Sequence, residues 1–255
     1  TMFSTTDYDK LQQIMKESPE KNELLTRLLE SHRMEISTIS HEIRNPLTLV
    51  YSTLQLIETQ HPEVTSFRHW TEMHQDIEYM KQLLEELSSY NNGERLHLLS
   101  VVTESFFQTI SLSFAASLLD TDIEFTSRIS PELPETMLDS TKIKQTILNL
   151  LGNARDAVLA RTDNMHPSIS MDVALEDSHI LISVSDTGCG ISSEDMNSIF
   201  EPFVTHKRTG TGLGLAVAQR IVHAHHGSIC ATSTVGIGST FTITLPVQQD
   251  TQQES

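Results

Sequence analysis

The stretch W-T-E-M-H-Q-D-I-E-Y-M-K-Q-L-L-E-E-L, residues 70–87, decides the architecture of the first third of the chain. Its apolar residues recur at alternating spacings of three and four, which is the periodicity of a helix that packs along one narrow stripe. They are Trp70, Met73, Ile77, Met80, Leu84 and Leu87. The sequence therefore predicts a long amphipathic helix, which Asn91-Asn92-Gly93 ends.

A second helical pattern precedes this stretch, from about Lys21 to Gln60, and His61-Pro62 breaks it. Its apolar members, again three or four residues apart, are Ile36, Ile39, Ile43, Leu47, Val50, Leu54 and Ile57. Two long helices joined by a short turn form an antiparallel hairpin. Because one hairpin cannot enclose both stripes fully, we expect two copies to pair as a four-helix bundle, and hence a homodimer.

After Gly93 the pattern changes to alternating helices and strands. We expect helices over 101–119, 140–160 and 212–226, with Asp139 as the N-cap of the second and Gly227 ending the third. We expect strands over 122–129, 168–175, 179–185, 228–233 and 239–247, and a mobile loop over 191–210. Helices on one face of a mixed sheet make an α+β sandwich. The predicted domains are therefore 1–92, a helical hairpin, and 93–248, a sandwich, followed by a disordered tail over 249–255.

Composition excludes several classes of function. The net charge is −17 and both halves are acidic, so a contact with nucleic acid or with an anionic membrane is not expected. No apolar run reaches the length of a membrane span. The two cysteines, Cys189 and Cys230, form no disulfide framework, which favours the cytoplasm; we expect Cys189 to be accessible and Cys230, in a strand, to be buried.

The first candidate for chemistry is His41, in the segment S-H-E-I-R-N-P-L over residues 40–47. At about 100° per residue, His41 lies opposite the midpoint of Ile39 and Ile43, so its imidazole should point into water. Most surface histidines have no chemical role. The neighbours favour a role here: Glu42 can orient the imidazole or take its proton, and Asn45, one turn on, can place a water.

Pro46 supports the same interpretation. A proline in mid-helix removes a backbone hydrogen bond, at a cost of about 3 kcal/mol or more. Such a cost inside a well-formed helical pattern suggests a bend that serves a site.

Three further patches carry ligand chemistry. Asn149 and Asn153 are four apart, so they share one helix face, and their amide oxygens suit Mg²⁺; a merely polar helix face is the alternative. Asp186 ends a strand before Gly188 and Gly190, where a carboxylate can accept from an exocyclic amine while the glycines let a purine approach the backbone. Gly210, Gly212 and Gly214 open the helix that begins near Leu213, whose N–H groups favour phosphate, although such a run could equally mark a hinge.

As an ordered set, these patches resemble the catalytic half of bacterial sensor histidine kinases. The segment 40–47 is similar to the phosphoacceptor box of the dimerisation and histidine-phosphotransfer domain. The resemblance implies that His41 is autophosphorylated, that Glu42 acts as its base and that Arg44 steadies the transferred phosphoryl group. It also implies that Asn45 supports phosphatase activity toward the phospho-aspartate of a partner.

The later patches resemble the GHKL ATPases, a superfamily that includes gyrase, Hsp90 and MutL, and that resemblance implies bound ATP and Mg²⁺. Asn153 is then the principal Mg²⁺ ligand and Asn149 the second, while Asp186 pairs with the adenine amino group. I-F-E-P-F over 199–203 resembles a box whose aromatics anchor a lid over ATP, and Lys207 beyond it could reach the γ-phosphate. The implied nucleotide-binding residues are Asn149, Asn153, Asp186, Gly188, Gly190, Phe203, Lys207, Gly210, Thr211, Gly212, Leu213, Gly214 and Thr240.

The resemblance thus implies an ATP–Mg²⁺-dependent protein-histidine kinase that passes its phosphoryl group from His41 to an aspartate in the receiver domain of a response regulator. We expect that regulator to dock near Thr48, Tyr51, Ser52 and Gln55 and the start of the second helix. Two alternatives remain open: a phosphatase or phosphotransfer adaptor that no longer hydrolyses ATP, and a non-kinase GHKL ATPase that uses nucleotide to close a clamp.

Overall fold

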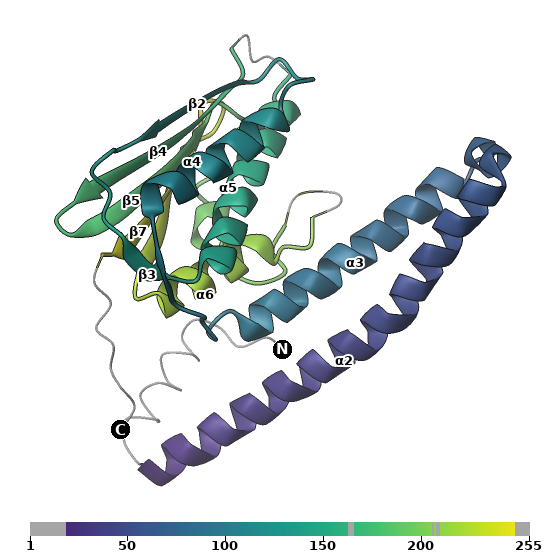
Figure 1. Ribbon diagram of the computed structural model, residues 1–255, viewed down its shortest axis with the longest axis horizontal. Coiled ribbons are helices and arrows are strands. Elements are labelled where there is room, and N and C mark those ends of the chain that lie inside the picture. Colours follow the sequence, from purple (N-terminus) through teal and green to yellow (C-terminus); the bar gives the residue numbers. More distant parts are fainter. Residues whose placement is uncertain (1–18, 163–165, 206, 208–209, 248–255) are drawn as a thin grey trace. The chain divides into compact units, whose positions relative to one another are not determined.

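The computed structural model describes residues 19–162, 166–205, 207 and 210–247 (Figure 1). The chain divides into two compact units, Thr1–Asn92 and Gly93–Ser255. The tail predicted over 249–255 lies outside the described residues. Within the residues described, no helix is both long enough and apolar enough to cross a membrane.

The first unit is the predicted helical hairpin. Helix α2 spans Pro19–Gln60, the short 3₁₀ helix η1 spans Pro62–Ser66, and helix α3 spans Trp70–Asn92. The chain leaves the first long helix at the predicted break, because Pro62 cannot donate the next helical hydrogen bond and instead starts η1. Helix α2 continues through Pro46.

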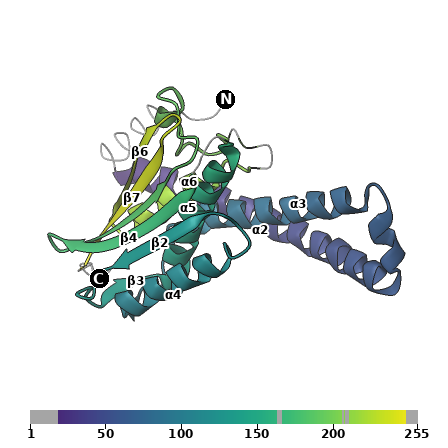
Figure 2. The ribbon, with the colours of Figure 1, turned by 90° about the horizontal axis from the view of Figure 1, so that it is seen from above.

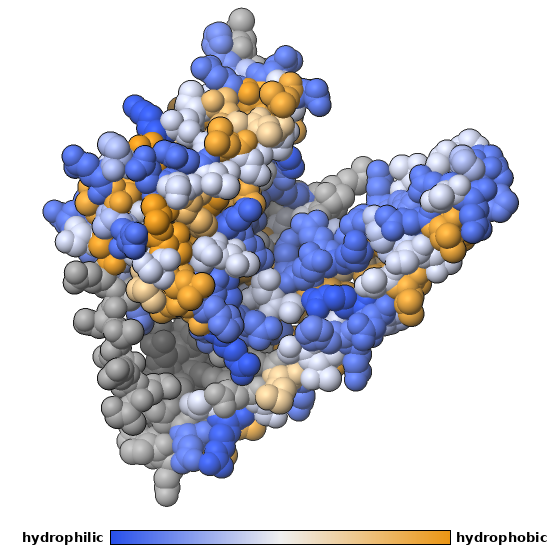
Figure 3. All heavy atoms as spheres, viewed as in Figure 1, coloured by the Kyte–Doolittle hydropathy of each residue, from blue (hydrophilic) through white to orange (hydrophobic). Residues whose placement is uncertain are grey.

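Only some of the apolar stripe residues are buried between the two helices of one chain. Leu47 and Leu54 of α2 pack with Ile77 and Leu84 of α3, and Tyr51 and Trp70 lie against this cluster. The other members, also seven residues apart within each helix, keep large exposed fractions: Ile43 49%, Val50 49%, Met73 37% and Met80 43%. Apolar atoms accordingly show among polar ones along the surface of the hairpin (Figure 3).

Within its described residues, the second unit contains three long helices and two sheets. In chain order its elements are β1 Leu99–Val101, α4 Thr103–Ala116, β2 Glu124–Ile129, β3 Thr136–Leu138, α5 Ser140–Ala160, β4 Ser168–Glu176, β5 His179–Asp186, η2 Asp195–Asn197, α6 Gly214–Ala224, β6 Ser228–Thr234 and β7 Gly238–Pro246. The main sheet has the order β2-β4-β5-β7-β6, in which only the β2–β4 pair is parallel. Strands β1 and β3 form a separate antiparallel pair.

The helices of this unit cover one face of the main sheet (Figure 2). Alternate residues of the central strands point toward them and are buried, such as Met171 in β4, Ile182 in β5 and Ile243 in β7. Their neighbours in sequence point to the opposite face. This is the predicted sandwich of helices on a mixed sheet.

Three expectations about this unit were wrong in detail. Strands β1 and β3 were not predicted, because three residues each are too few for alternation to be visible in the sequence. The helix expected from Val101 begins later, since Val101 belongs to β1 and pairs with Thr136. Helix α6 begins two residues later than expected, at Gly214. Cys230 is exposed rather than buried, because β6 is an edge strand and this side chain points away from the helices.

The start of α5 is tied to α6 by a buried histidine. Asp139 caps α5, since its carboxylate accepts from the backbone N–H of Lys142 at 3.1 Å and from that of His97 at 2.9 Å. Its own backbone N–H donates to Nε2 of His225 at 3.0 Å, and Nδ1 of His225 lies 2.7 Å from the carbonyl of Ile221. His225 is fully buried, so both ring nitrogens are used only by the neutral ring with its proton on Nδ1.

We therefore expect the unit to lose stability in mild acid because of His225. Burial lowers the pKa of His225 below its usual value of 6.5, so the unfolded chain binds the proton first, and stability present above about pH 6.5 is lost as the pH falls toward the folded pKa. In His225→Gln the free energy of unfolding should be lower at pH 7 but flatter between pH 7 and 5, as measured by urea titration. His223→Gln, an exposed histidine in the same helix, is the control and should keep the slope of the parent chain.

Candidate functional site

His41 lies exposed on α2. Its nearest polar partner is Arg44, whose Nη1 is 3.4 Å from Nδ1 of His41, while Nη2 is 3.4 Å from the carbonyl of Leu84 on α3. Because a guanidinium can only donate, this contact makes Nδ1 an acceptor and leaves the ring proton on Nε2. Arg44 thus links the histidine to the second helix of the hairpin.

The other residues of the box lie around His41 as helical phase predicts. Glu42 and Asn45 are exposed, so both side chains are accessible to a ligand or a water. Pro46 has no N–H to offer the carbonyl of Glu42, four residues earlier, which is therefore without its helical partner. Ser40 is buried, and its hydroxyl donates to the carbonyl of Ile36 at 2.7 Å.

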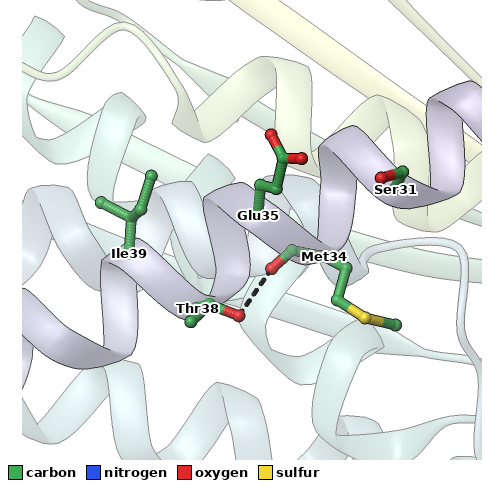
Figure 4. Close-up of a pocket in the computed structure, with 5 residues that line it drawn as sticks. All are labelled: Ser31, Met34, Glu35, Thr38 and Ile39. Carbon is green, nitrogen blue, oxygen red and sulfur yellow. Dashed lines mark hydrogen bonds between the residues drawn. The ribbon is translucent and has the colours of Figure 1, made fainter.

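A surface hollow of about 450 Å³ lies one to three turns before His41, against one stretch of α2. Ser31, Met34, Glu35, Thr38 and Ile39 line it (Figure 4). The hydroxyl of Thr38 is already used, since it donates to the carbonyl of Met34 at 2.9 Å. All the described lining residues come from a single helix, so no described side chain converges on a ligand from a second side.

In the second unit, helix α5 presents three polar side chains on one face: Asn149, Asn153 and Asp156. Nζ of Lys207 donates to Oδ1 of Asn153 and to Oδ2 of Asp156, both at 2.7 Å. The structure thus brings together Asn153 and Lys207, both predicted from the sequence. Asp156 was missed, although its spacing of three from Asn153 placed it on the same face.

Asn149 lies deeper than Asn153. Its side-chain nitrogen is buried and finds no hydrogen-bond partner within the described ranges. A Cβ added at Gly214, the first residue of α6, would come within 2.5 Å of Oδ1 of Asn149. The middle of α5 and the start of α6 therefore meet at this amide, and only a glycine leaves it room.

Asp186 ends β5 beneath a tightly held loop. Its Oδ1 accepts from the backbone N–H of Gly188 at 2.8 Å and from that of Ser239 at 3.3 Å, whereas no described residue is hydrogen-bonded to Oδ2. Burial raises the pKa of the Asp186 carboxyl, and these two hydrogen bonds partly oppose the rise. One carboxylate oxygen is thus held in place and the other remains available to a donor.

The loop after Asp186 is held from both sides. The N–H of Cys189 donates to the carbonyl of Ala157 on α5 at 3.1 Å, and its carbonyl accepts from Gly236 in the β6–β7 turn at 2.8 Å. Gly190 lies so close to that turn that a Cβ would come within 2.3 Å of the carbonyl of Thr234. Cys189 itself is exposed, as expected.

The structure does not bring Thr240 to Asp186. Asp186 pairs with Ser239 across β5 and β7, so these two share the helix-covered face, while Thr240 points to the other face and its hydroxyl lies 2.8 Å from that of Ser185. Ser239, one residue earlier, is the hydroxyl next to Asp186, and its Oγ is 3.0 Å from that of Ser233. Nucleotide binding by Thr240 thus stays a prediction, and Ser239 is the neighbouring hydroxyl that the structure adds.

The glycine run leads into α6. Gly212 has φ +69°, a conformation that favours glycine, and its carbonyl accepts from the N–H of Phe203 at 2.8 Å. Thr211 accepts from the N–H of Leu213 at 3.2 Å, and Leu213 is fully buried at the N-cap of α6. Phe203 is 51% exposed, so the contact that holds it in the described structure is the backbone hydrogen bond to Gly212. Gly210 begins this run, and a Cβ there would come within 2.5 Å of Oγ1 of Thr205.

Comparison with known families identifies both units. Residues 31–95 match the His Kinase A (phospho-acceptor) domain, and residues 138–249 match the histidine kinase-, DNA gyrase B-, and HSP90-like ATPase.

Curated relatives match over most of this chain. It is 31% identical to the signal transduction histidine-protein kinase AtoS of Escherichia coli K12 over 84% of this chain and 35% of the relative. It is 29% identical to sporulation kinase E of Bacillus subtilis over 94% of this chain and 32% of the relative. It is 30% identical to the sensor histidine kinase ZraS of Escherichia coli K12, over 82% and 44%. The chain thus spans less than half the length of each of these relatives.

Solved structures share the fold. Full-length ShkA in complex with AMPPNP superposes with a TM-score of 0.70, at 24% identity, over 84% of this chain and 45% of that one. The catalytic domain of the histidine kinase ThkA superposes with a TM-score of 0.52, at 26% identity, over 59% of this chain and 96% of that one.

The contact between Gly214 and Asn149 predicts opposite effects for two glycine substitutions. Gly214→Ala should lower the free energy of unfolding by about 1–3 kcal/mol, because the new Cβ must displace a buried amide. Gly152→Ala, inside α5 where a Cβ meets nothing within 4 Å, should raise it by about 0.5–1 kcal/mol through helix propensity. Urea unfolding of both variants measures the pair, and equal changes would show that the Asn149 contact has no influence.

Proposed function

The chain belongs to the sensor histidine kinases, and from that premise we propose that it transfers the γ-phosphoryl group of ATP to His41 and from there to an aspartate in the receiver domain of a response regulator. The observation that carries the proposal is the presence of both halves of the reaction in one chain. The exposed imidazole of His41 is followed in the sequence by the exposed carboxylate of Glu42. A separate unit holds both the Asp186 carboxylate, whose Oδ2 has no hydrogen-bond partner among the described residues, and a glycine-rich start to helix α6.

The polar groups of the second unit fit ATP and Mg²⁺. Asn153 and Asp156 already hold a cation, the ammonium of Lys207, so their oxygens suit a metal ion. Oδ2 of Asp186, to which no described residue is hydrogen-bonded, would accept from the amino group of adenine, and the backbone N–H groups at the start of α6 would bind phosphate. When bound, ATP supplies the phosphoryl group and Mg²⁺ neutralises its charge.

At His41 the chain must control one proton. Nε2 attacks phosphorus only when it carries a lone pair, whereas the Arg44 contact leaves the proton on Nε2. We propose that Arg44 moves from Nδ1 toward the transferred group, that the ring proton passes from Nε2 to Nδ1 through exchange with water, and that Nδ1–H then donates to Glu42. Glu42 is exposed and adjacent in sequence, which suits this role.

The same proposal includes a homodimer and a docking surface. Ile43, Val50, Met73 and Met80 are the half of the apolar stripes that one hairpin leaves exposed, and a second hairpin would bury them. The regulator would dock on the exposed Thr48, Ser52 and Gln55. Tyr51 would offer less surface to the regulator, because its ring packs toward α3, with Nζ of Lys81 4.0 Å from the ring centroid.

We also propose that the chain works in the cytoplasm, where ATP is available. Both cysteines are free thiols, which suits that compartment.

Incubation with γ-labelled ATP tests the proposal against its alternatives. A histidine kinase acquires label that survives alkali and is lost in acid. An adaptor that does not hydrolyse ATP acquires none, and a clamp ATPase releases free phosphate without labelling the protein.

His41→Gln should abolish the alkali-stable label and leave nucleotide affinity within about twofold of the parent chain. The reason is that His41 lies in the hairpin unit and the proposed nucleotide residues lie in the other. Labelling and titration with a fluorescent nucleotide measure the two effects separately. Label persisting at a histidine in this variant would mean that another histidine is the acceptor.

Asn45→Ala should keep autophosphorylation and slow dephosphorylation of the phosphorylated regulator by at least about tenfold, because Asn45 lies one turn from His41 and is suited to orient a water. The measurement is loss of label from the phosphorylated receiver domain. Thr53→Ala, on the same helix but two turns further on, is the control and should behave as the parent chain. Equal dephosphorylation by Asn45→Ala and the control would exclude a phosphatase role for Asn45.

A further inference from the structure

Two oxygens from α5 converge on one lysine. Nζ of Lys207 is 2.7 Å from Oδ1 of Asn153 and 2.7 Å from Oδ2 of Asp156, although Lys207 is more than 50 residues away in sequence. The ammonium is therefore held between an amide oxygen and a carboxylate oxygen. Asp156 has a second cation nearby, since Nε of Arg155 is 3.8 Å from Oδ1, beyond hydrogen-bond distance.

The chemistry of this pair is that of a cation site. Carboxylate and amide oxygens are hard ligands that suit Mg²⁺ as well as an ammonium, and lysine acts as a compact point charge. Lys207 and a divalent ion that used the same oxygens would exclude each other. Two positive groups cannot share one pair of oxygens without strong repulsion.

We propose that Asp156 and Asn153 form a single cation seat, which Lys207 occupies until Mg²⁺ bound with nucleotide displaces it. The proposal rests on the proposed nucleotide site and adds two things to it. Asp156 becomes a residue that positions the cation. Lys207 becomes an internal competitor of Mg²⁺, freed to face the phosphates only once the metal has taken its place.

Competition between Lys207 and Mg²⁺ can be distinguished from a contact between Lys207 and the γ-phosphate by the Mg²⁺ dependence of ADP binding. ADP has no γ-phosphate, so the contact proposed for Lys207 does not contribute to ADP binding. In Lys207→Met the Mg²⁺ concentration that half-saturates ADP binding should fall about threefold or more, because the seat is then empty. In EDTA the same variant should bind ADP no more tightly than the parent chain. Isothermal titration calorimetry of the full chain measures both.

Arg155→Met is the matched control, because it removes one positive charge near Asp156 without emptying the seat. It should change the half-saturating Mg²⁺ concentration less than Lys207→Met does. An equal change in the two variants would mean that removing any nearby positive charge has the same effect on Mg²⁺ binding, and would overturn the proposal.

Asp156→Asn, made in the parent chain and in Lys207→Met, tests the carboxylate. In Lys207→Met it should raise the half-saturating Mg²⁺ concentration, because the metal loses a charged oxygen. In the parent chain the rise should be smaller, because the same change also releases Lys207. The two substitutions should therefore be non-additive, and strictly additive effects would overturn the proposal.

These outcomes separate the seat from the proposed function. If the parent chain does not bind ADP in saturating Mg²⁺, the nucleotide site itself is wrong. If it binds ADP but Lys207→Met leaves the dependence on Mg²⁺ unchanged, the nucleotide site stands and the seat is wrong.

Discussion

The burial of one face of α5 is the constraint on which the second unit depends. Ile143, Ile147, Leu150 and Leu151 have no exposed surface, and together they fix the rotation of this helix against its neighbours. A rotation of one residue, about 100°, would move Asn149, Asn153 and Asp156 from the candidate site into other surroundings. The apolar spacing along α5 therefore positions the polar chemistry on its other face.

In the hairpin, the apolar residues of each helix fall into a buried set and an exposed set. Each stripe alternates between members that pack within the chain, such as Leu47 and Leu54, and members that stay half exposed, such as Ile43 and Val50. Both sets repeat every seven residues, so each helix has two narrow apolar lines rather than one. A hairpin with a buried core and a regular exposed line is suited to pair with a second copy. His41 lies off both lines and is exposed in the single hairpin.

Local chemistry made much of this fold predictable. Asp139 marked the start of α5 because a side-chain cap needs only residues three apart, and the break at His61-Pro62 marked the end of α2. The sequence could not distinguish Ser239 from Thr240, because a shift of one residue in a strand exchanges the two faces, and the register is set by pairing with β5. The contact of Lys207 with Asp156 joins positions 51 residues apart, which no local pattern encodes.

The two candidate sites share one electrostatic feature. The chain has a net charge of −17, and two of its positive side chains contact groups that we propose take part in phosphoryl transfer. Arg44 contacts the imidazole of His41, and Lys207 contacts Asn153 and Asp156. All five side chains are at least partly exposed to water, where such contacts are individually weak, so an incoming metal ion or phosphate can replace them at low cost. Each site is thus held in a defined geometry by a positive side chain, Arg44 or Lys207, whose contacts are weak enough for the proposed reaction to displace them.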